Sequence, residues 1–258
     1  MAKYIPDVLK NFDKQINRLN RHSKYSVFSD FLLWVIAGFA ISDELNWQPT
    51  NNYTKDELPV FPDIFSAFAL AMNERIKADN HWADILGEYY MCANISNSSA
   101  GQFFTPEHVC TLMAQMAIFE NDKRHNAHDC CCGSGRLLLA ANSVQLGMKL
   151  YASDLDVTCC RMTVVNFLMH GCVGEVVQKD GLLADSYFGG WAVNEGINNP
   201  FSKYHGIPHV RFLPKEESVI YQNGFIEKVI PIEEEKPVIV EVEPITEKPK
   251  LPTQLTLF

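Results

Sequence analysis

The chain has 258 residues, 47% of them hydrophobic, and a formal net charge of −9. This length and composition exclude a disordered chain and a small disulfide-stapled fold, and they allow one sizeable core with a small helical module. The acidic balance removes the bulk positive charge through which many proteins bind nucleic acid. Any affinity for DNA must therefore come from a local patch or from a partner.

The cysteines and the apolar runs indicate the cellular compartment of the protein. Eight cysteines include the adjacent groups Cys130–Cys132 and Cys159–Cys160, and neighbouring thiols rarely meet disulfide geometry, so a reducing cytoplasm is expected. The first ten residues lack an apolar signal core. The longest apolar run, Phe31–Ile41, is about half of the roughly 20 residues that a membrane helix needs, so we expect no membrane insertion.

The first hundred residues are predicted to be a helical N-terminal region. Residues 7–22 have apolar side chains at helical spacing, and residues 1–24 carry a local charge of +4, for which a solvated helix face is the favoured interpretation. Further helices are expected over Phe28–Ile41, Pro62–Lys77 and Trp82–Met91.

The sequence pattern changes twice after this region. From about residue 126, short apolar runs alternate with helical stretches, which predicts an α/β sheet. From residue 227 to residue 258, prolines are interleaved with glutamates and lysines. Such a segment buries too little apolar area to offset its ordering entropy, so we expect a disordered, extended tail.

A glycine-rich segment lies at the start of the α/β pattern. Asp129 comes before Gly133-Ser134-Gly135, and an apolar helical run follows; this arrangement lets a backbone turn approach a ligand closely. About twenty residues later, Leu150–Asp154 is predicted to be a strand that ends in a carboxylate, the position from which doubly wound sheets hold a ribose. A nucleoside-like ligand is inferred, with an ordinary strand-to-helix connection as the alternative.

Several blocks resemble the adenine-N6 DNA methyltransferases that form the modification (M) subunit of type I restriction systems. Residues 101–106 are similar to the family's G-Q-F-[YF]-T-P block, and residues 129–135 to its D-P-x-C-G-S-G loop, with Cys130 in place of proline. Residues 166–171 resemble N-L-x-L-H-G, and residues 180–183 resemble the family's G-D-x-L strand end, with Lys179 in place of the glycine. The resemblance implies a partial Rossmann-like methyltransferase sheet over residues 101–226.

The same resemblance implies S-adenosylmethionine (AdoMet) as the cofactor and a set of residues that bind it. Gly133 and Gly135 would approach its methionine end, Asp154 its ribose and Asp180 its adenine. The full set comprises Gln102, Phe103, Phe104, Thr105, Pro106, Asp129, Gly133, Ser134, Gly135, Asp154 and Asp180.

The catalytic block departs from the family pattern. The family carries [DNS]-P-P-[YF] after a hydrophobic strand, and the only candidate here is Asn198-Asn199-Pro200-Phe201, preceded by residues 189–197, which predict a poor strand. By resemblance, Asn198 would accept from the adenine amino group, Pro200 would fix the turn and Phe201 would stack on the flipped base. A plain Asn-Pro turn is the equally weighted alternative.

Two further features bear on completeness and on metals. Few residues separate Phe201 from the tail, so the later strands and the target-recognition region are expected to be missing, and a specificity or completing subunit is a candidate partner. No CxxC spacing is present among Cys130–Cys132, Cys159, Cys160 and Cys172. These cysteines are interpreted as small buried hydrophobic residues, with no metal site.

The sequence ends in an apolar peptide after the tail. Gln254-Leu255-Thr256-Leu257-Phe258 resembles the Q-L-x-L-F peptide with which bacterial proteins bind the replication sliding clamp. The resemblance implies that Gln254, Leu255, Leu257 and Phe258 bind the clamp. Leu257 and Phe258 would fill an apolar pocket, Gln254 would anchor through hydrogen bonds, and the tail would act as a tether.

The expected function is AdoMet-dependent methylation of adenine N6 in DNA, of restriction-modification or mobile-element type, which would make the protein a site-specific DNA methyltransferase. The alternative is a catalytically degenerate, DNA-associated adaptor that binds AdoMet and the sliding clamp. Methylation of RNA or protein is disfavoured because the block at residues 102–106 resembles the DNA family.

Overall fold

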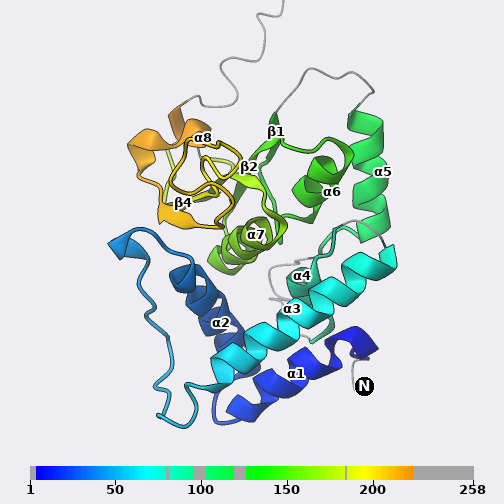
Figure 1. The fold of residues 1–258 in the computed structure, drawn as a ribbon, viewed down its shortest axis with the longest axis vertical. Coiled ribbons are helices and arrows are strands. Elements are labelled where there is room, and N and C mark those ends of the chain that lie inside the picture. The colour runs from blue at the N-terminus through cyan, green and yellow to red at the C-terminus, as the bar shows by residue number, and fades with distance from the viewer. Residues whose placement is uncertain are drawn as a thin grey trace, which may run out of the picture.

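The computed structural model describes residues 4–79, 82–93, 95, 103–118, 126–183 and 185–222. These residues form an α/β fold in which a layer of N-terminal helices packs beneath a five-stranded sheet (Figure 1). The helices are α1 (Lys10–Ile16), α2 (Lys24–Gly38), α3 (Val60–Asp79), α4 (Ile85–Cys92), α5 (Glu107–Ala117), α6 (Arg136–Val144), α7 (Val157–His170) and α8 (Val219–Gln222). The strands are β1 (Asn126–Asp129), β2 (Lys149–Asp154), β3 (Val173–Gln178), β4 (Gly189–Val193) and β5 (Val210–Phe212). The predicted fold class is confirmed, while the tail lies outside the described residues.

The N-terminal helices agree with the sequence pattern to within a few residues. Short 3-10 turns at Asp7–Leu9 and Asn17–Leu19 continue α1 at both ends. Four basic residues of the first 24 positions pair with acids, as Lys10–Asp7, Lys24–Asp13, Arg18–Asp63 and Arg21–Glu57. These positive charges are therefore neutralised locally, by pairs that each add little stability.

The sheet has the order β1-β2-β3-β4-β5. The first three strands are parallel, with α6 and α7 as the crossovers, which is the alternation of strands and helices expected for a partial Rossmann-like sheet. Strand β4 is antiparallel to β3, and β5 is antiparallel to β4. The parallel unit is thus extended at its β3 side by a hairpin.

Strand β4 corrects one expectation from the sequence. The segment before Asn198 was predicted to be a poor strand, yet Gly189–Val193 pairs with β3 along its whole length. Glycine at position 190 permits close packing, because a Cβ there would lie 2.6 Å from Tyr187 Oη and 3.1 Å from the carbonyl oxygen of Leu213. The hairpin also supplies β5, a strand that the sequence did not predict.

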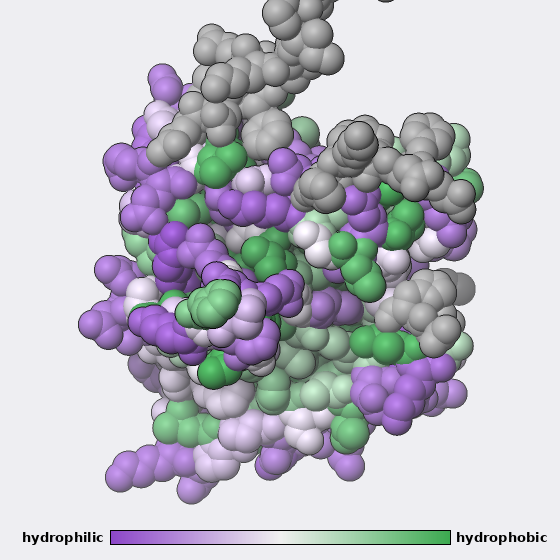
Figure 2. All heavy atoms as spheres, turned by 45° about the horizontal axis from the view of Figure 1, so that its top comes forward, coloured by the Kyte–Doolittle hydropathy of each residue, from purple (hydrophilic) through white to green (hydrophobic). Residues whose placement is uncertain are grey.

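Both faces of the sheet are covered by apolar side chains. On one face, α7 packs against α2 and α4, so the helical layer and the sheet share one continuous core. On the other face, a small cluster forms under α8, consisting of Tyr151, Val177, Ala192, Leu213 and Ile220. Hydrophobic side chains are also exposed among the polar ones on the surface seen in Figure 2.

No helix among the described residues is long and apolar enough to span a bilayer.

Candidate cofactor site

The candidate site lies at the carboxyl ends of the three parallel strands. The register pairs Asp129 at the end of β1 with Ala152, and Asp154 at the end of β2 with Gln178 at the end of β3. Because parallel strands end at one edge of a sheet, Asp129, Asp154 and the residues after β3 share this edge. This edge is where open α/β sheets bind their ligands.

The glycine-rich turn, residues 130–135, leads from β1 to α6 and makes a hydrogen bond to the end of β2. Gly133 and Gly135 have φ values of 56° and 80°, in the left-handed region where glycine is favoured. Gly135 precedes the first residue of α6, and a Cβ there would lie 2.8 Å from Thr163 Cγ2. The backbone N–H of Gly133 donates to Asp154 Oδ2 over 2.9 Å. Both positions therefore favour glycine, because the backbone has a positive φ and a Cβ would crowd a neighbouring side chain.

Asp154 is the best-supported carboxylate of the site. Its Oδ1 accepts a hydrogen bond from the Asp156 N–H at 2.9 Å, and its Oδ2 accepts from Gly133. Burial raises the pKa of Asp154, although these two hydrogen bonds act in the opposite direction. Each carboxylate oxygen keeps a lone pair for a further donor, so ribose hydroxyls could still be bound.

The Phe103–Pro106 segment lies over the glycine-rich turn. The ring of Phe104 would be 3.0 Å from a Cβ on Gly133, and it stacks on Tyr90 with ring centroids 5.8 Å apart. The Arg136 guanidinium sits 5.6 Å from the centroid of Phe104. Phe103, by contrast, is 84% exposed, Pro106 caps the start of α5, and Gln102 lies outside the described residues.

A shallow cavity brings most of the predicted cofactor residues together. Its volume is about 190 Å³. Its lining comprises Phe103, Phe104, Thr105, Asp129, Cys131, Cys132, Gly133, Ser134, Arg136 and Leu137. Six of the eleven residues assigned by resemblance line this cavity, and Asp154 accepts a hydrogen bond from the lining residue Gly133.

Asp180 also lies at this edge, two residues beyond the end of β3. Its Oδ1 accepts from the Leu182 N–H at 2.9 Å, and its own N–H donates to Ser186 Oγ at 2.8 Å. A Cβ on Gly181 would be 3.5 Å from the carbonyl oxygen of Cys130. The turn after β3 therefore approaches the turn after β1.

A buried carboxylate that the sequence analysis missed holds the site together. Asp84 is 0% exposed and caps α4 through the Gly87 N–H. It accepts from Ser134 Oγ, from Arg136 Nε at 2.8 Å and from Asn166 Nδ2 at 2.8 Å. Asp84 thus ties the helical layer to the glycine-rich turn and to α7. Its position before an apolar helix is a capping signal, but that signal does not reveal the tertiary partners.

Arg136 balances this buried charge. Burial lowers the pKa of Arg136, but the Asp84 carboxylate more than offsets the effect, so the pKa is raised overall. Its Nη1 also donates to the carbonyl oxygen of Thr105 at 2.8 Å. One ion pair therefore fixes the Phe103–Pro106 segment, the glycine-rich turn and α4 relative to each other.

The predicted catalytic residues are not brought to this site. Strand β4 runs antiparallel, so Gly189 pairs with Gln178 at the cofactor edge while Val193 pairs with Gly174 at the far edge. The four steps of β4 cover about 13 Å, and Asn198, Pro200 and Phe201 follow in the β4–β5 connection. Phe201 is 95% exposed, and its N–H donates to Asn199 Oδ1 at 3.0 Å. The local geometry is that of the Asn-Pro turn weighed as the alternative.

The cysteines divide into two groups. Cys132, Cys159, Cys160 and Cys172 are buried, as expected for small hydrophobic residues. Cys130 and Cys131 are exposed, which corrects the expectation for these two, because they occupy the turn at the sheet edge instead of a strand interior.

Comparison with known families identifies the segment that carries this site. Residues 82–205 match the N-6 DNA methylase family model. Over this segment, slightly less than half of the chain, the protein resembles that family. The match begins beside Asp84 and includes the glycine-rich turn, Asp154 and the Asn198–Phe201 block, so the resemblance to modification subunits is confirmed.

Two relatives extend the comparison of this segment. The chain is 32% identical over 98 residues to the type I restriction enzyme MpnII methylase subunit of Mycoplasma pneumoniae, a match that covers 34% of this chain and 18% of the relative. A type I restriction-modification methyltransferase subunit from Streptococcus thermophilus matches with a TM-score of 0.31 and 22% identity, over 67% of this chain and 38% of that one. The matches thus span less than half of either relative.

Proposed function

We propose that the N-6 DNA methylase segment binds AdoMet at the carboxyl edge of β1–β3 and serves adenine-N6 methylation of DNA. The observation that supports this proposal is the hydrogen bond from the Gly133 N–H to Asp154, the acid that we propose to bind the ribose, within a family-matched segment. The match to a type I methylase subunit favours a restriction-modification context, and a mobile-element origin is compatible with it.

The chemistry of the cavity fits AdoMet. The cofactor carries a positive ammonium and sulfonium, and its ribose and adenine present hydrogen-bond donors. Asp129 lines the cavity beside the glycine-rich turn, where it suits the ammonium, and Asp154 and Asp180 follow along the same edge. Phe104 offers an apolar wall. Bound AdoMet would supply the methyl group, and these residues would bind and orient it.

Transfer to adenine needs an acceptor for N6 and an aromatic ring for the flipped base. Asn198 and Phe201 lie at the other edge of the sheet from Asp154. We therefore assign the target-base contacts to a completing or specificity subunit, and we place cofactor binding in residues 101–226 of this chain. The comparisons lend no support to the adaptor alternative.

The direct test is transfer of labelled methyl groups from AdoMet to unmethylated bacterial DNA. The protein is assayed alone and with the proteins encoded beside it, and Asp154→Ala serves as the cofactor-site variant. We expect transfer in the presence of a partner and its loss in Asp154→Ala. Equal transfer by the variant, or none in any combination, would overturn the proposed function.

A further inference from the structure

The sheet has an open lateral edge along β1, which is distinct from the carboxyl ends of the strands where the candidate cofactor site lies. Within the described residues, β1 pairs with β2 on one side and has no strand on its other side. An edge strand presents backbone donors and acceptors along its outer side, and these can pair with an added strand. The four residues of β1, Asn126–Asp129, include no proline that would block such pairing.

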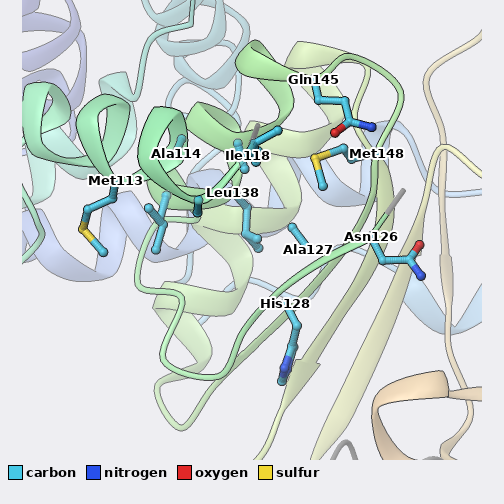
Figure 3. Close-up of a pocket in the computed structure, with 12 residues that line it drawn as sticks. Met113, Ala114, Ile118, Asn126, Ala127, His128, Leu138, Gln145 and Met148 are labelled. Atoms are coloured by element: carbon cyan, nitrogen blue, oxygen red, sulfur yellow. The ribbon is translucent and has the colours of Figure 1, made fainter. Parts of the chain in front are cut away.

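An apolar cavity lies beside this edge. It has a volume of about 330 Å³ and is bounded by α5, α6 and β1 (Figure 3). Met113, Ile118, Ala127, Leu138 and Met148 line it. An added strand that paired with β1 would place alternate side chains in this cavity.

The exposed face of α5 enlarges this apolar surface. Leu112, Met113 and Met116 are 55%, 45% and 67% exposed. Large apolar side chains that are adjacent on one helix and next to a cavity mark a surface that binds another segment.

One segment of this chain has the pattern of the missing strand. Val238-Ile239-Val240-Glu241-Val242 alternates three valines with Ile239 and Glu241, and prolines stand outside it at positions 237 and 244. Three β-branched valines on one face, with Ile239 and Glu241 on the other, are typical of a half-buried edge strand. The segment lies outside the described residues.

The length of the intervening chain allows this pairing. Helix α8 ends at Gln222 and packs against β3. The fifteen residues from 223 to 237 span up to about 50 Å when extended. Moving from β3 past β2 and β1 to a new edge position requires three strand spacings, about 14 Å in all.

We propose that Val238–Val242 pairs with the outer side of β1 as a sixth strand, with its three valines in the cavity between α5 and α6. The composition of the tail predicts that this segment does not fold alone, and β1 supplies the backbone partner that it needs. Eleven residues remain between Val242 and Gln254, so the terminal peptide stays available. This inference does not depend on methyl transfer.

The test is hydrogen–deuterium exchange of the full chain, read at the amides of residues 126–129 and 238–242. Val240→Pro removes a strand N–H at the centre of the segment, and Glu247→Pro is the matched control outside it. We expect exchange at 126–129 to be about tenfold faster or more in Val240→Pro and in a chain ending at Gln222, and unchanged in Glu247→Pro.

A peptide covering residues 237–244, added to the chain that ends at Gln222, should restore the protection of β1. Exchange at residues 126–129 that is the same in the full chain, in Val240→Pro and in the shortened chain would overturn the proposal. Protection that rises with protein concentration in the shortened chain would show that a second copy occupies the edge, and would also overturn it.

Discussion

The backbone N–H of Gly133 donates a hydrogen bond to Asp154 Oδ2 over 2.9 Å, and this contact joins the turn after β1 to the end of β2. The ring of Phe104 packs closely against the same glycine. A ligand bound at the turn would therefore contact a carboxylate and an aromatic ring that are already in place. This preorganisation is the basis of the proposed cofactor site.

The Asp84–Arg136 pair is expected to be the most sensitive polar contact of the protein. Asp84→Asn leaves the buried Arg136 charge without its counter-ion, which should destabilise the fold by about 3–5 kcal/mol. Denaturant unfolding measures this change. Adding Arg136→Met to Asp84→Asn should recover part of the loss. Asp63→Asn, which breaks an exposed pair with Arg18, should cost at most about 1 kcal/mol, and an equally small cost for Asp84→Asn would disprove the role of Asp84.

His170 is expected to make stability depend on pH. Its Nε2 accepts from the Ala83 N–H at 3.2 Å, and its Nδ1 lies 2.8 Å from the carbonyl oxygen of Asn166, an arrangement that suits the neutral ring. Burial lowers the pKa of His170 below its usual value of 6.5. Below pH 6.5 the His170 ring is protonated in the unfolded state but stays neutral in the folded state. The free energy of unfolding therefore falls as the pH falls, by up to about 1.4 kcal/mol per pH unit.

Thermal unfolding between pH 7.5 and pH 5.5 measures the effect of His170, with His170→Gln as the control. Burial also raises the pKa of Asp154 and Glu175, whose contributions change in the opposite direction as the pH falls. The difference between wild type and His170→Gln removes these shared contributions. Parallel pH profiles for the two proteins would contradict the assignment.

Phe201 is expected to have no effect on the cofactor. Because β4 carries it to the far edge of the sheet, Phe201→Ala should change neither AdoMet affinity nor the stability of the core. If a partner supplies the target-base contacts, methyl transfer by the assembled enzyme should also be unchanged in Phe201→Ala. Abolished transfer with unaltered AdoMet affinity would show that the Asn198–Phe201 block is catalytic after all.

The terminal peptide is expected to bind the bacterial sliding clamp on its own. Residues 252–258 lie outside the described part of the chain, so this prediction rests on the Q-L-x-L-F resemblance. Short peptides order on binding, and an affinity of about micromolar is expected. Replacing Leu257 and Phe258 by alanine should weaken binding by about a hundredfold or more. The measurement is fluorescence anisotropy of a labelled native peptide and of its doubly substituted form. Equal binding by these two peptides would exclude clamp recognition.

The sequence predicted those parts of the site that depend on local patterns. A strand that ends in an acid located Asp154, and paired glycines before an apolar run located Gly133 and Gly135. These signals are local because the strand, the turn and the helix are adjacent in the chain. The positions of the four N-terminal helices followed from apolar periodicity in the same way, to within a few residues.

Tertiary pairing could not be predicted from the same signals. Asp84 is an ordinary helix cap in sequence, and its role depends on Arg136 and Asn166, which are more than fifty residues away. The antiparallel direction of β4 follows from its short connection to β3, because the ten residues 179–188 are fewer than a parallel crossover needs. The apolar pattern alone did not reveal that Asn198 and Phe201 follow the far end of β4, and their catalytic role stays a prediction.

Calorimetric titration of the full chain with AdoMet tests the central claim most directly, with Asp154→Ala as the variant and Glu195→Ala, on the far hairpin, as the matched control. We predict binding by wild type and by Glu195→Ala. In Asp154→Ala the affinity should fall by about 1–3 kcal/mol, because an acceptor for the ribose hydroxyls is removed. Absence of heat with wild type at millimolar AdoMet, or equal affinity in Asp154→Ala, would contradict the assignment of this edge as the cofactor site.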